Sequence, residues 1–150
     1  MAEFFSFLVD QWMLSVTFVV LSLMLIWSFV APSIRGFAEM RPVEIVKLIN
    51  DDETVVLDVR SENEFLDGHI VGSINVPAGY LAKRLEELEK YKQKAVVVVC
   101  KSGARSKVGC AMLRKAGFEN VTALAGGLLA WQHDKYPVSK TKVAKGKGKK

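Results

Sequence analysis

The sequence contains little cysteine and little histidine. Its 150 residues include two cysteines, Cys100 and Cys110, and two histidines, His69 and His133. Two cysteines are too few for a disulfide framework, and their spacing is not that of a Cys-x-x-Cys redox motif or a zinc site. The histidines are isolated in the sequence, so we expect no metal centre and no metal cofactor. This cysteine usage suits a reducing compartment.

Charged residues are absent from one long segment near the N-terminus. Residues Trp12 to Ala31 include no ionisable side chain. As a helix rising about 1.5 Å per residue, this segment would span about 30 Å, the thickness of the hydrocarbon core of a bilayer. Trp12 and Trp27 lie towards its two ends, where membrane interfaces favour aromatic side chains. The sequence therefore predicts a short tail over residues 1–11 and one transmembrane helix in the lipid bilayer over residues 12–31.

Basic residues are missing before Arg35, whereas Arg35, Arg41 and Lys47 follow the apolar segment closely. Because basic flanking residues stay on the cytoplasmic side, this asymmetry predicts a single-pass protein of the inner (plasma) membrane with its C-terminal domain in the cytoplasm. A cleaved secretory signal is the alternative, and Ala31-Pro32-Ser33 weakly resembles a cleavage site. Such a signal has a positively charged start and a shorter apolar run, and both are missing here.

Acidic residues are missing from the C-terminal tail. The net charge is +5, but six lysines between Lys140 and Lys150 leave −1 for the rest of the chain. A Lys/Gly-rich tail has too little apolar content to fold, so we expect residues 138–150 to form a basic disordered tail. A solvated tail is one interpretation, and binding to anionic lipid or nucleic acid is the other. Because the domain itself is not basic, we expect no nucleic-acid partner.

Strand-like and helix-like segments alternate over residues 37–137. Helical segments are expected at residues 40–50, 61–68, 81–88, 104–116 and 126–132. Ser61 and Glu64 form a capping-box pair at the start of the second of these. Strands are expected at residues 54–59, 73–76, 95–100 and 121–124. Val96 to Val99 do not alternate with polar residues, which indicates a strand buried on both faces. The pattern predicts an α/β domain with a mostly parallel sheet flanked by helices.

Cys100 stands between the end of a predicted strand and the start of a predicted helix. Ligands of parallel sheets bind beyond the carboxyl ends of the strands, so Cys100 and Asp58 should border one crevice. A thiol there faces unpaired backbone N–H groups and the positive end of a helix dipole, which favour the thiolate. Gly103 and Ala104 leave room for the loop amides to turn around an anion. Cys110 has no such neighbours and is interpreted as a core residue.

Two basic side chains flank this cysteine. Arg105 either adds positive charge near the thiolate or makes a structural ion pair with an acid beneath the loop. Lys101 either attracts anionic donors or is an ordinary exposed lysine. The sequence leaves both questions open.

Several short motifs accompany the loop Cys100-Lys101-Ser102-Gly103-Ala104-Arg105. They are Asp58-Val59-Arg60, Glu64-Phe65, Gly68-His69-Ile70, Gly72-Ser73-Ile74-Asn75-Val76-Pro77, Gly117-Phe118, Gly126-Gly127 and Trp131. Their combination over residues 37–137 resembles the rhodanese-like domain family. With the N-terminal apolar segment, the whole chain resembles the small membrane-anchored, single-domain rhodaneses of bacteria.

The resemblance implies a sulfurtransferase with Cys100 as its catalytic residue. The thiolate would take a sulfane sulfur from thiosulfate or a persulfide donor and pass it to cyanide or to a thiol, including a protein thiol. Lys101, Ser102, Gly103, Ala104 and Arg105 would hold the Cys100 persulfide, with no cofactor.

Supporting roles are expected for residues outside the loop. Asp58 and Arg60 match family positions near the pocket and are interpreted as supporting the loop. Arg60 is expected to pair with Glu64, four residues further on. His69 is interpreted as a turn residue and not as a base.

Two other function classes remain as alternatives. The first alternative is a tethered binding module, because some rhodanese-like domains lack activity and bind partners. Such domains often lose the cysteine, which is present here. Cysteine-loop phosphatases and arsenate reductases are the other. Their loops have five residues between cysteine and arginine, whereas only four separate Cys100 from Arg105. The shorter loop favours one sulfur atom over a phosphate.

Overall fold

The computed structural model describes residues 12–34, 36–50 and 53–140, and the side chains of all of these except residues 29–34. The chain divides into two compact units, residues 1–36 and residues 37–150. The N-terminal tail expected at residues 1–11 and most of the basic tail lie outside the described residues.

The described residues of the first unit include the helix α2 (Trp12–Ile34), of 23 residues. Its described large apolar side chains are exposed, among them Phe18 and Met24. The helix continues to Ile34, three residues past its expected end at Ala31. Within the part of the chain whose placement is described, no helix combines the length and the apolarity needed to cross a membrane.

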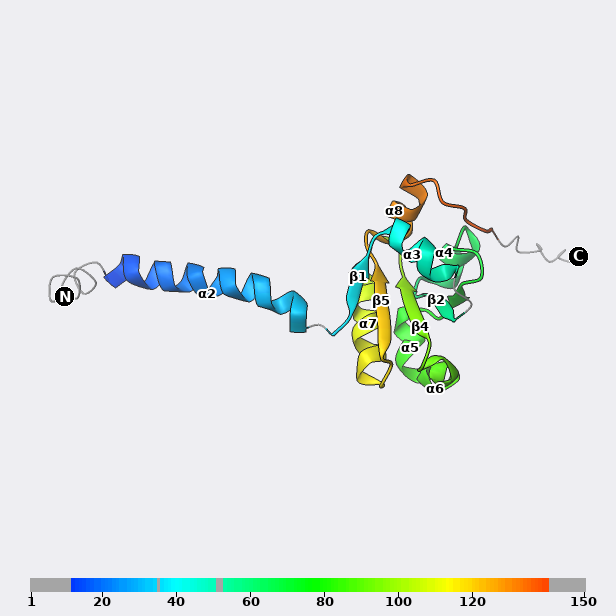
Figure 1. The fold of residues 1–150 in the computed structure, drawn as a ribbon, viewed down its shortest axis with the longest axis horizontal. Helices are drawn as coiled ribbons and strands as arrows, with labels where there is room; N and C mark the ends of the chain where they lie inside the picture. The colour runs from blue at the N-terminus through cyan, green and yellow to red at the C-terminus, as the bar shows by residue number, and fades with distance from the viewer. Residues whose placement is uncertain (1–11, 35, 51–52, 141–150) are drawn as a thin grey trace, which may run out of the picture. The chain divides into compact units, whose positions relative to one another are not determined.

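The second unit is built on a five-stranded sheet in the order β1-β5-β4-β2-β3, and all of its strand pairs are parallel (Figure 1). The strands are β1 (Ala38–Met40), β2 (Thr54–Asp58), β3 (Ile74–Asn75), β4 (Ala95–Val99) and β5 (Asn120–Leu124). The predicted parallel sheet is therefore confirmed. The edge strand β1 was not expected, because its Ala-Glu-Met sequence has no β-branched residue. It forms through pairing with β5, which overrides its weak propensity.

Helices connect these strands. They are α3 (Pro42–Ile49), α4 (Glu62–Leu66), α5 (Ala78–Leu81), α6 (Leu85–Leu88), α7 (Ala104–Lys115) and α8 (Gly127–His133), with 3₁₀ turns at Ala82–Arg84 and Glu89–Tyr91. The capping box predicted at Ser61 and Glu64 opens α4. The single helix expected over residues 81–88 is instead α5, a 3₁₀ turn and α6. Leu81 and Leu88 are nevertheless buried. The apolar side chains of this segment therefore reach the core although the helix is interrupted.

The sheet has apolar side chains packed on both of its faces. Along β4, Val96 and Val98 point into a cluster shared with α5, α6 and α7, whereas Val97 and Val99 point into a cluster shared with α3 and α8. All four valines are buried. The prediction of a strand covered on both faces is confirmed. Because β4 is also the middle strand of the sheet, its end lies at the centre of the domain.

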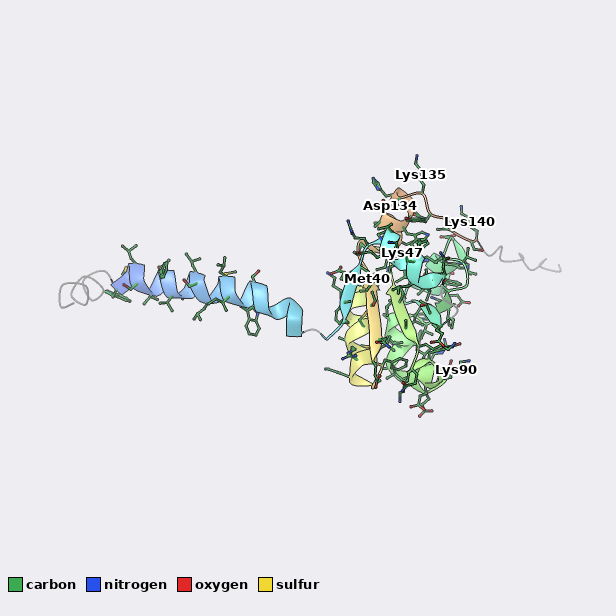
Figure 2. The ribbon with its side chains drawn as sticks, in the orientation of Figure 1. Met40, Lys47, Lys90, Asp134, Lys135 and Lys140 are labelled. Atoms are coloured by element: carbon green, nitrogen blue, oxygen red, sulfur yellow. The ribbon has the colours of Figure 1, made fainter. Side chains whose placement is uncertain are left out.

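The described fold continues past residue 137, where the domain was expected to end. Ser139 and His69 form an antiparallel bridge, with Ser139 N donating to His69 O at 2.8 Å and His69 N donating to Ser139 O at 2.9 Å. Val138 packs against the apolar cluster of α3 and α8. Lys140, at the end of the described chain, is exposed (Figure 2).

Candidate active site

The carboxyl ends of two central strands meet beside Cys100. Asp58 at the end of β2 is paired in register with Val99 at the end of β4, and Cys100 follows directly. Asp58 and Cys100 therefore lie at the same edge of the sheet, as predicted. Cys100 is 1% exposed and sits between β4 and the start of α7.

Donors from the loop surround the Cys100 sulfur. The Gly103 N–H lies 3.1 Å from Sγ, and Gly103 takes a φ of +100°, a left-handed conformation that glycine adopts readily. The Ser106 hydroxyl lies 3.6 Å from Sγ and 2.8 Å from Gly103 O. Because a hydroxyl rotates to suit its partners, Ser106 can turn its proton to the sulfur once Cys100 is ionised.

These donors decide the ionisation of Cys100. Burial raises the pKa of the thiol, but hydrogen bonds from the Ser106 backbone and hydroxyl and from the Gly103 and Ser102 backbones outweigh burial, so the pKa is lowered. Cys110 differs, because burial in α7 raises the pKa of its thiol to about 12. Cys110 is fully buried in the core, as predicted.

Arg105 makes a two-pronged ion pair with Glu64. Its Nη1 lies 2.7 Å from Glu64 Oε2 and its Nη2 lies 2.8 Å from Oε1. The hydrogen bond from Arg105 is the main cause that lowers the pKa of Glu64 to about 2. Of the two roles left open by the sequence, the contacts of Arg105 are those of a scaffold that ties the start of α7 to α4. The hydrogen bonds that lower the pKa of Cys100 come from other residues.

Asp58 and Arg60 form a buried ion pair. Arg60 Nη2 lies 2.6 Å from Asp58 Oδ2 and also donates to Gly68 O at 2.7 Å. The predicted pairing of Arg60 with Glu64 is wrong. Arg60 precedes the first turn of α4, so helical i,i+4 spacing does not apply to it, and Glu64 is held by Ser61 and Arg105.

The start of α8 supports the loop from behind. Leu128 N donates to Cys100 O at 2.8 Å, and Leu129 N donates to Lys101 O at 3.1 Å. A Cβ on Gly127 would lie 2.4 Å from Cys100 O, so only glycine allows this approach. The Gly126-Gly127 pair was recognised in the sequence as one of the family motifs, but its close approach to Cys100 was not predicted. Ser106 was missed because it lies one residue beyond the recognised loop.

His69 takes part in packing. Its ring stacks on Phe65 with centroids 3.8 Å apart, and its Nδ1 lies 2.8 Å from Phe65 O. Within the described residues, no group of histidine, cysteine, aspartate and glutamate side chains is arranged to hold a metal ion.

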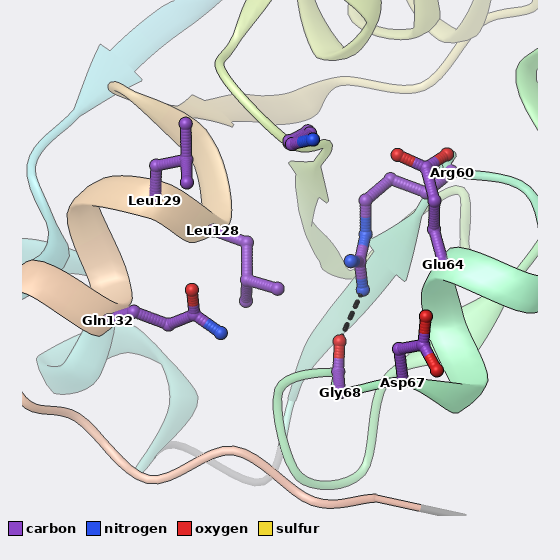
Figure 3. A pocket seen from close by; sticks show the side chains of 8 residues that line it. Arg60, Glu64, Asp67, Gly68, Leu128, Leu129 and Gln132 are labelled. Carbon is purple, nitrogen blue, oxygen red and sulfur yellow. Dashed lines mark hydrogen bonds between the residues drawn. The ribbon is translucent and has the colours of Figure 1, made fainter.

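A cavity of about 190 Å³ opens beside the loop. Its lining residues are Arg60, Glu64, Asp67, Gly68, Lys101, Leu128, Leu129 and Gln132 (Figure 3). Cys100 is not among the lining residues, but its chain neighbour Lys101 is. Of the loop residues, Lys101, Ser102 and Ala104 are exposed, whereas Gly103 is buried.

Replacing Ser106 with alanine is expected to raise the pKa of the Cys100 thiol, because the thiolate loses a hydroxyl donor. Alkylation of Cys100 by iodoacetamide at neutral pH should slow about tenfold, and the pH at which the rate is half-maximal should rise. Cys110 is buried and protonated in this range, so the rate reports on Cys100. An unchanged pH profile would show that Ser106 does not stabilise the thiolate.

Known proteins match the same part of the chain. A family model described as the rhodanese-like domain matches residues 41–134. The uncharacterized protein YibN of Escherichia coli is 40% identical over 100 residues, which cover 66% of this chain and 70% of that protein. A sulfurtransferase of Allochromatium vinosum is 32% identical over 92 residues, which cover 61% of this chain and 84% of that protein.

Solved structures show the same fold. A rhodanese-related protein from Thermoplasma volcanium has a TM-score of 0.63 and 30% identity, over 69% of this chain and 98% of that one. The α/β fold with its parallel sheet is thus shared with a protein of known structure. The matched family segment contains Cys100, its loop, and both Asp58 and Arg60.

Proposed function

Because the chain belongs to the rhodanese-like domain family, we propose that it is a sulfurtransferase in which Cys100 carries a sulfane sulfur as a persulfide. The observation that carries this proposal is the buried Cys100 thiol whose pKa is lowered by donors of its own loop. The sulfurtransferase among its relatives supports the same activity.

The first half of the reaction loads sulfur onto Cys100. The thiolate attacks the outer sulfur of thiosulfate, the sulfur–sulfur bond of the donor breaks, and sulfite leaves with the electron pair. A persulfide donor reacts in the same way and leaves as a thiolate. The loop donors that stabilise the thiolate, Gly103 N–H among them, face the negative charge of the persulfide.

The second half passes the sulfur on. An acceptor thiolate, or cyanide, attacks the outer sulfur of the persulfide, and the bond from that sulfur to Cys100 Sγ breaks. Cys100 leaves as a thiolate, and a thiol of lowered pKa is a good leaving group. The lowered pKa of Cys100 favours its thiolate, so the reaction depends less on a general base.

The contacts of Arg105 also bear on the phosphatase alternative. Each of its terminal nitrogens donates to Glu64, which holds the guanidinium against α4 and leaves fewer donors for the oxygens of a phosphate in the loop. This arrangement supports sulfur transfer over phosphoryl transfer.

A turnover assay separates the three function classes. The full-length chain, purified in detergent and supplied with thiosulfate and cyanide, is expected to form thiocyanate catalytically and to release no phosphate from an aryl phosphate. Phosphate release would favour the phosphatase class. Absence of thiocyanate and of any persulfide on Cys100 would favour a binding module.

We also propose that the chain is anchored in the inner (plasma) membrane by a single helix, with the α/β unit in the cytoplasm. The uncharged segment Trp12 to Ala31 supports this, since its backbone is helical throughout and its described apolar side chains are exposed. The basic residues that begin at Arg35 support the orientation. The described residues alone do not supply a spanning helix, so the anchor rests on the sequence up to Ala31.

Washing membranes with alkaline carbonate tests the anchor. The full-length chain is expected to stay with the membrane pellet, as a spanning protein does. Release into the supernatant would contradict the anchor.

A further inference from the structure

The charged residues that line the cavity beside the loop fall into two groups. Arg60 is neutralised by Asp58, and Glu64 by Arg105. Asp67 and Lys101, by contrast, have no ion pair or side-chain hydrogen bond within the described part of the chain. The cavity therefore offers one uncompensated carboxylate and one uncompensated ammonium to a ligand.

Arg60 adds a further donor to the cavity. Its side-chain hydrogen bonds all come from Nε and Nη2, so Nη1 has no acceptor within the described residues. No fully buried side-chain nitrogen in that part of the chain lacks a partner. Because Arg60 is only 4% exposed and lines the cavity, its Nη1 donors open onto that space.

The opposite wall comes from α8. Leu128 and Leu129 supply apolar surface, and Gln132 extends from α8 towards the wall that contains Gly68 and Asp67 (Figure 3). At about 190 Å³ the cavity is smaller than the roughly 300–1,000 Å³ pockets that hold drug-sized ligands. The cavity suits a small molecule with charges of both signs and a short apolar part.

We propose, on the basis of the sulfur transfer proposed above, that this cavity binds the sulfur acceptor, and that the acceptor is a small thiol carrying both an ammonium and a carboxylate group. Its carboxylate meets Lys101 and Arg60 Nη1, and its ammonium meets Asp67. Its carbon chain lies against Leu128.

Two residues that line the cavity adjoin Cys100 along the chain or through the backbone. Lys101 directly follows Cys100, and Leu128 N donates to Cys100 O. The acceptor thiolate attacks the outer sulfur of the Cys100 persulfide, the bond to Sγ breaks, and the Cys100 thiolate leaves with the electron pair. The product is the persulfide of the small thiol.

Asp67 is the residue to test, because it is exposed and is not among the hydrogen-bond partners of the Cys100 sulfur. The full-length chain is first loaded with thiosulfate and freed of excess donor. The persulfide is then discharged by L-cysteine, cysteamine, 3-mercaptopropionate or 2-mercaptoethanol. Asp67→Asn is expected to slow discharge by L-cysteine and by cysteamine, which carry an ammonium group, about fivefold. A change of this size corresponds to the loss of a partly exposed ion pair. The two thiols without an ammonium should keep their rates.

Each thiol is compared with itself between variants, so its intrinsic reactivity cancels. Asp67→Lys should slow cysteamine further and speed 3-mercaptopropionate, because the charge at this wall is reversed. Glu62→Gln is the matched control: Glu62 lies on the same helix, α4, but outside this cavity, and should change no rate. The rate of discharge by glutathione is measured in parallel, and its comparison with the rate for L-cysteine shows whether a peptide or a free amino acid is the preferred thiol.

Three results would overturn the inference. The first is an equal change of all four rates in Asp67→Asn, and the second is the same change in Glu62→Gln. The third is discharge by a protein dithiol that is faster than discharge by cysteine and does not depend on Asp67. In all three cases the persulfide has formed, so the proposed function stands. If thiosulfate loads no sulfur onto the wild-type chain, the proposed function fails and this inference fails with it.

Discussion

Replacement of Cys100 by serine is expected to lower kcat/KM for thiocyanate formation by at least about 10³-fold, because the reaction loses the atom that carries the sulfur. Serine keeps the shape of the site, and the Gly103 N–H can still donate to its oxygen. A hydroxyl in this position is not ionised near neutral pH and forms no persulfide. Activity is measured as thiocyanate released from thiosulfate and cyanide by the full-length chain.

The matched control is Cys110→Ala. Cys110 is fully buried and its pKa is raised to about 12, so it supplies no thiolate. This variant should retain activity within about twofold, since nucleophilic strength follows the thiolate. Comparable loss in the two cysteine variants would contradict the assignment of the reaction to Cys100.

Replacement of Gly127 by alanine is expected to destabilise the domain by about 3 kcal/mol, the combined size of a left-handed alanine and an overpacked contact. Gly127 has a φ of +60°, and its Cβ would meet Cys100 O at 2.4 Å and Lys101 O at 2.7 Å. These are backbone atoms, so α8 or the loop must move. The free energy of unfolding is measured by urea titration of the full-length chain.

Gly79→Ala serves as the control for the glycine prediction. Gly79 lies in α5, has no atom within 4 Å of an added Cβ, and has no positive φ. Alanine there should be neutral or stabilising, because alanine favours a helix over glycine. In the Gly127 variant, the remaining folded protein should also load sulfur more slowly, since Leu128 N no longer holds Cys100 O in place. Equal stability of the two variants would contradict the close packing of α8 on the loop.

The sequence predicted features that depend on one strand or one helix end. The four valines of β4 indicated burial on both faces, and Ser61 with Glu64 indicated the start of α4; the structure confirms both. The position of Cys100 between a strand and a helix followed from the same local patterns. Local sequence is sufficient here because an unbroken apolar run and a helix cap each depend on only a few neighbouring residues.

The features that sequence reasoning missed depend on contacts between distant segments. Arg105 pairs with Glu64, which lies 41 positions earlier in the sequence. Because Glu64 is taken by Arg105, Arg60 pairs with Asp58 instead. The edge strand β1 exists because β5 lies beside it. The turn of the loop that brings the Ser106 hydroxyl near the sulfur likewise needs the three-dimensional path of the chain.

The mass of the intact chain after incubation with thiosulfate tests the central claim most directly. Wild-type protein is expected to gain the mass of one sulfur atom, located on the peptide that contains Cys100, and to lose it when a thiol acceptor is added. Cys100→Ser should gain nothing. A wild-type chain that takes up no sulfur, or takes it up at Cys110, would contradict sulfur transfer through Cys100.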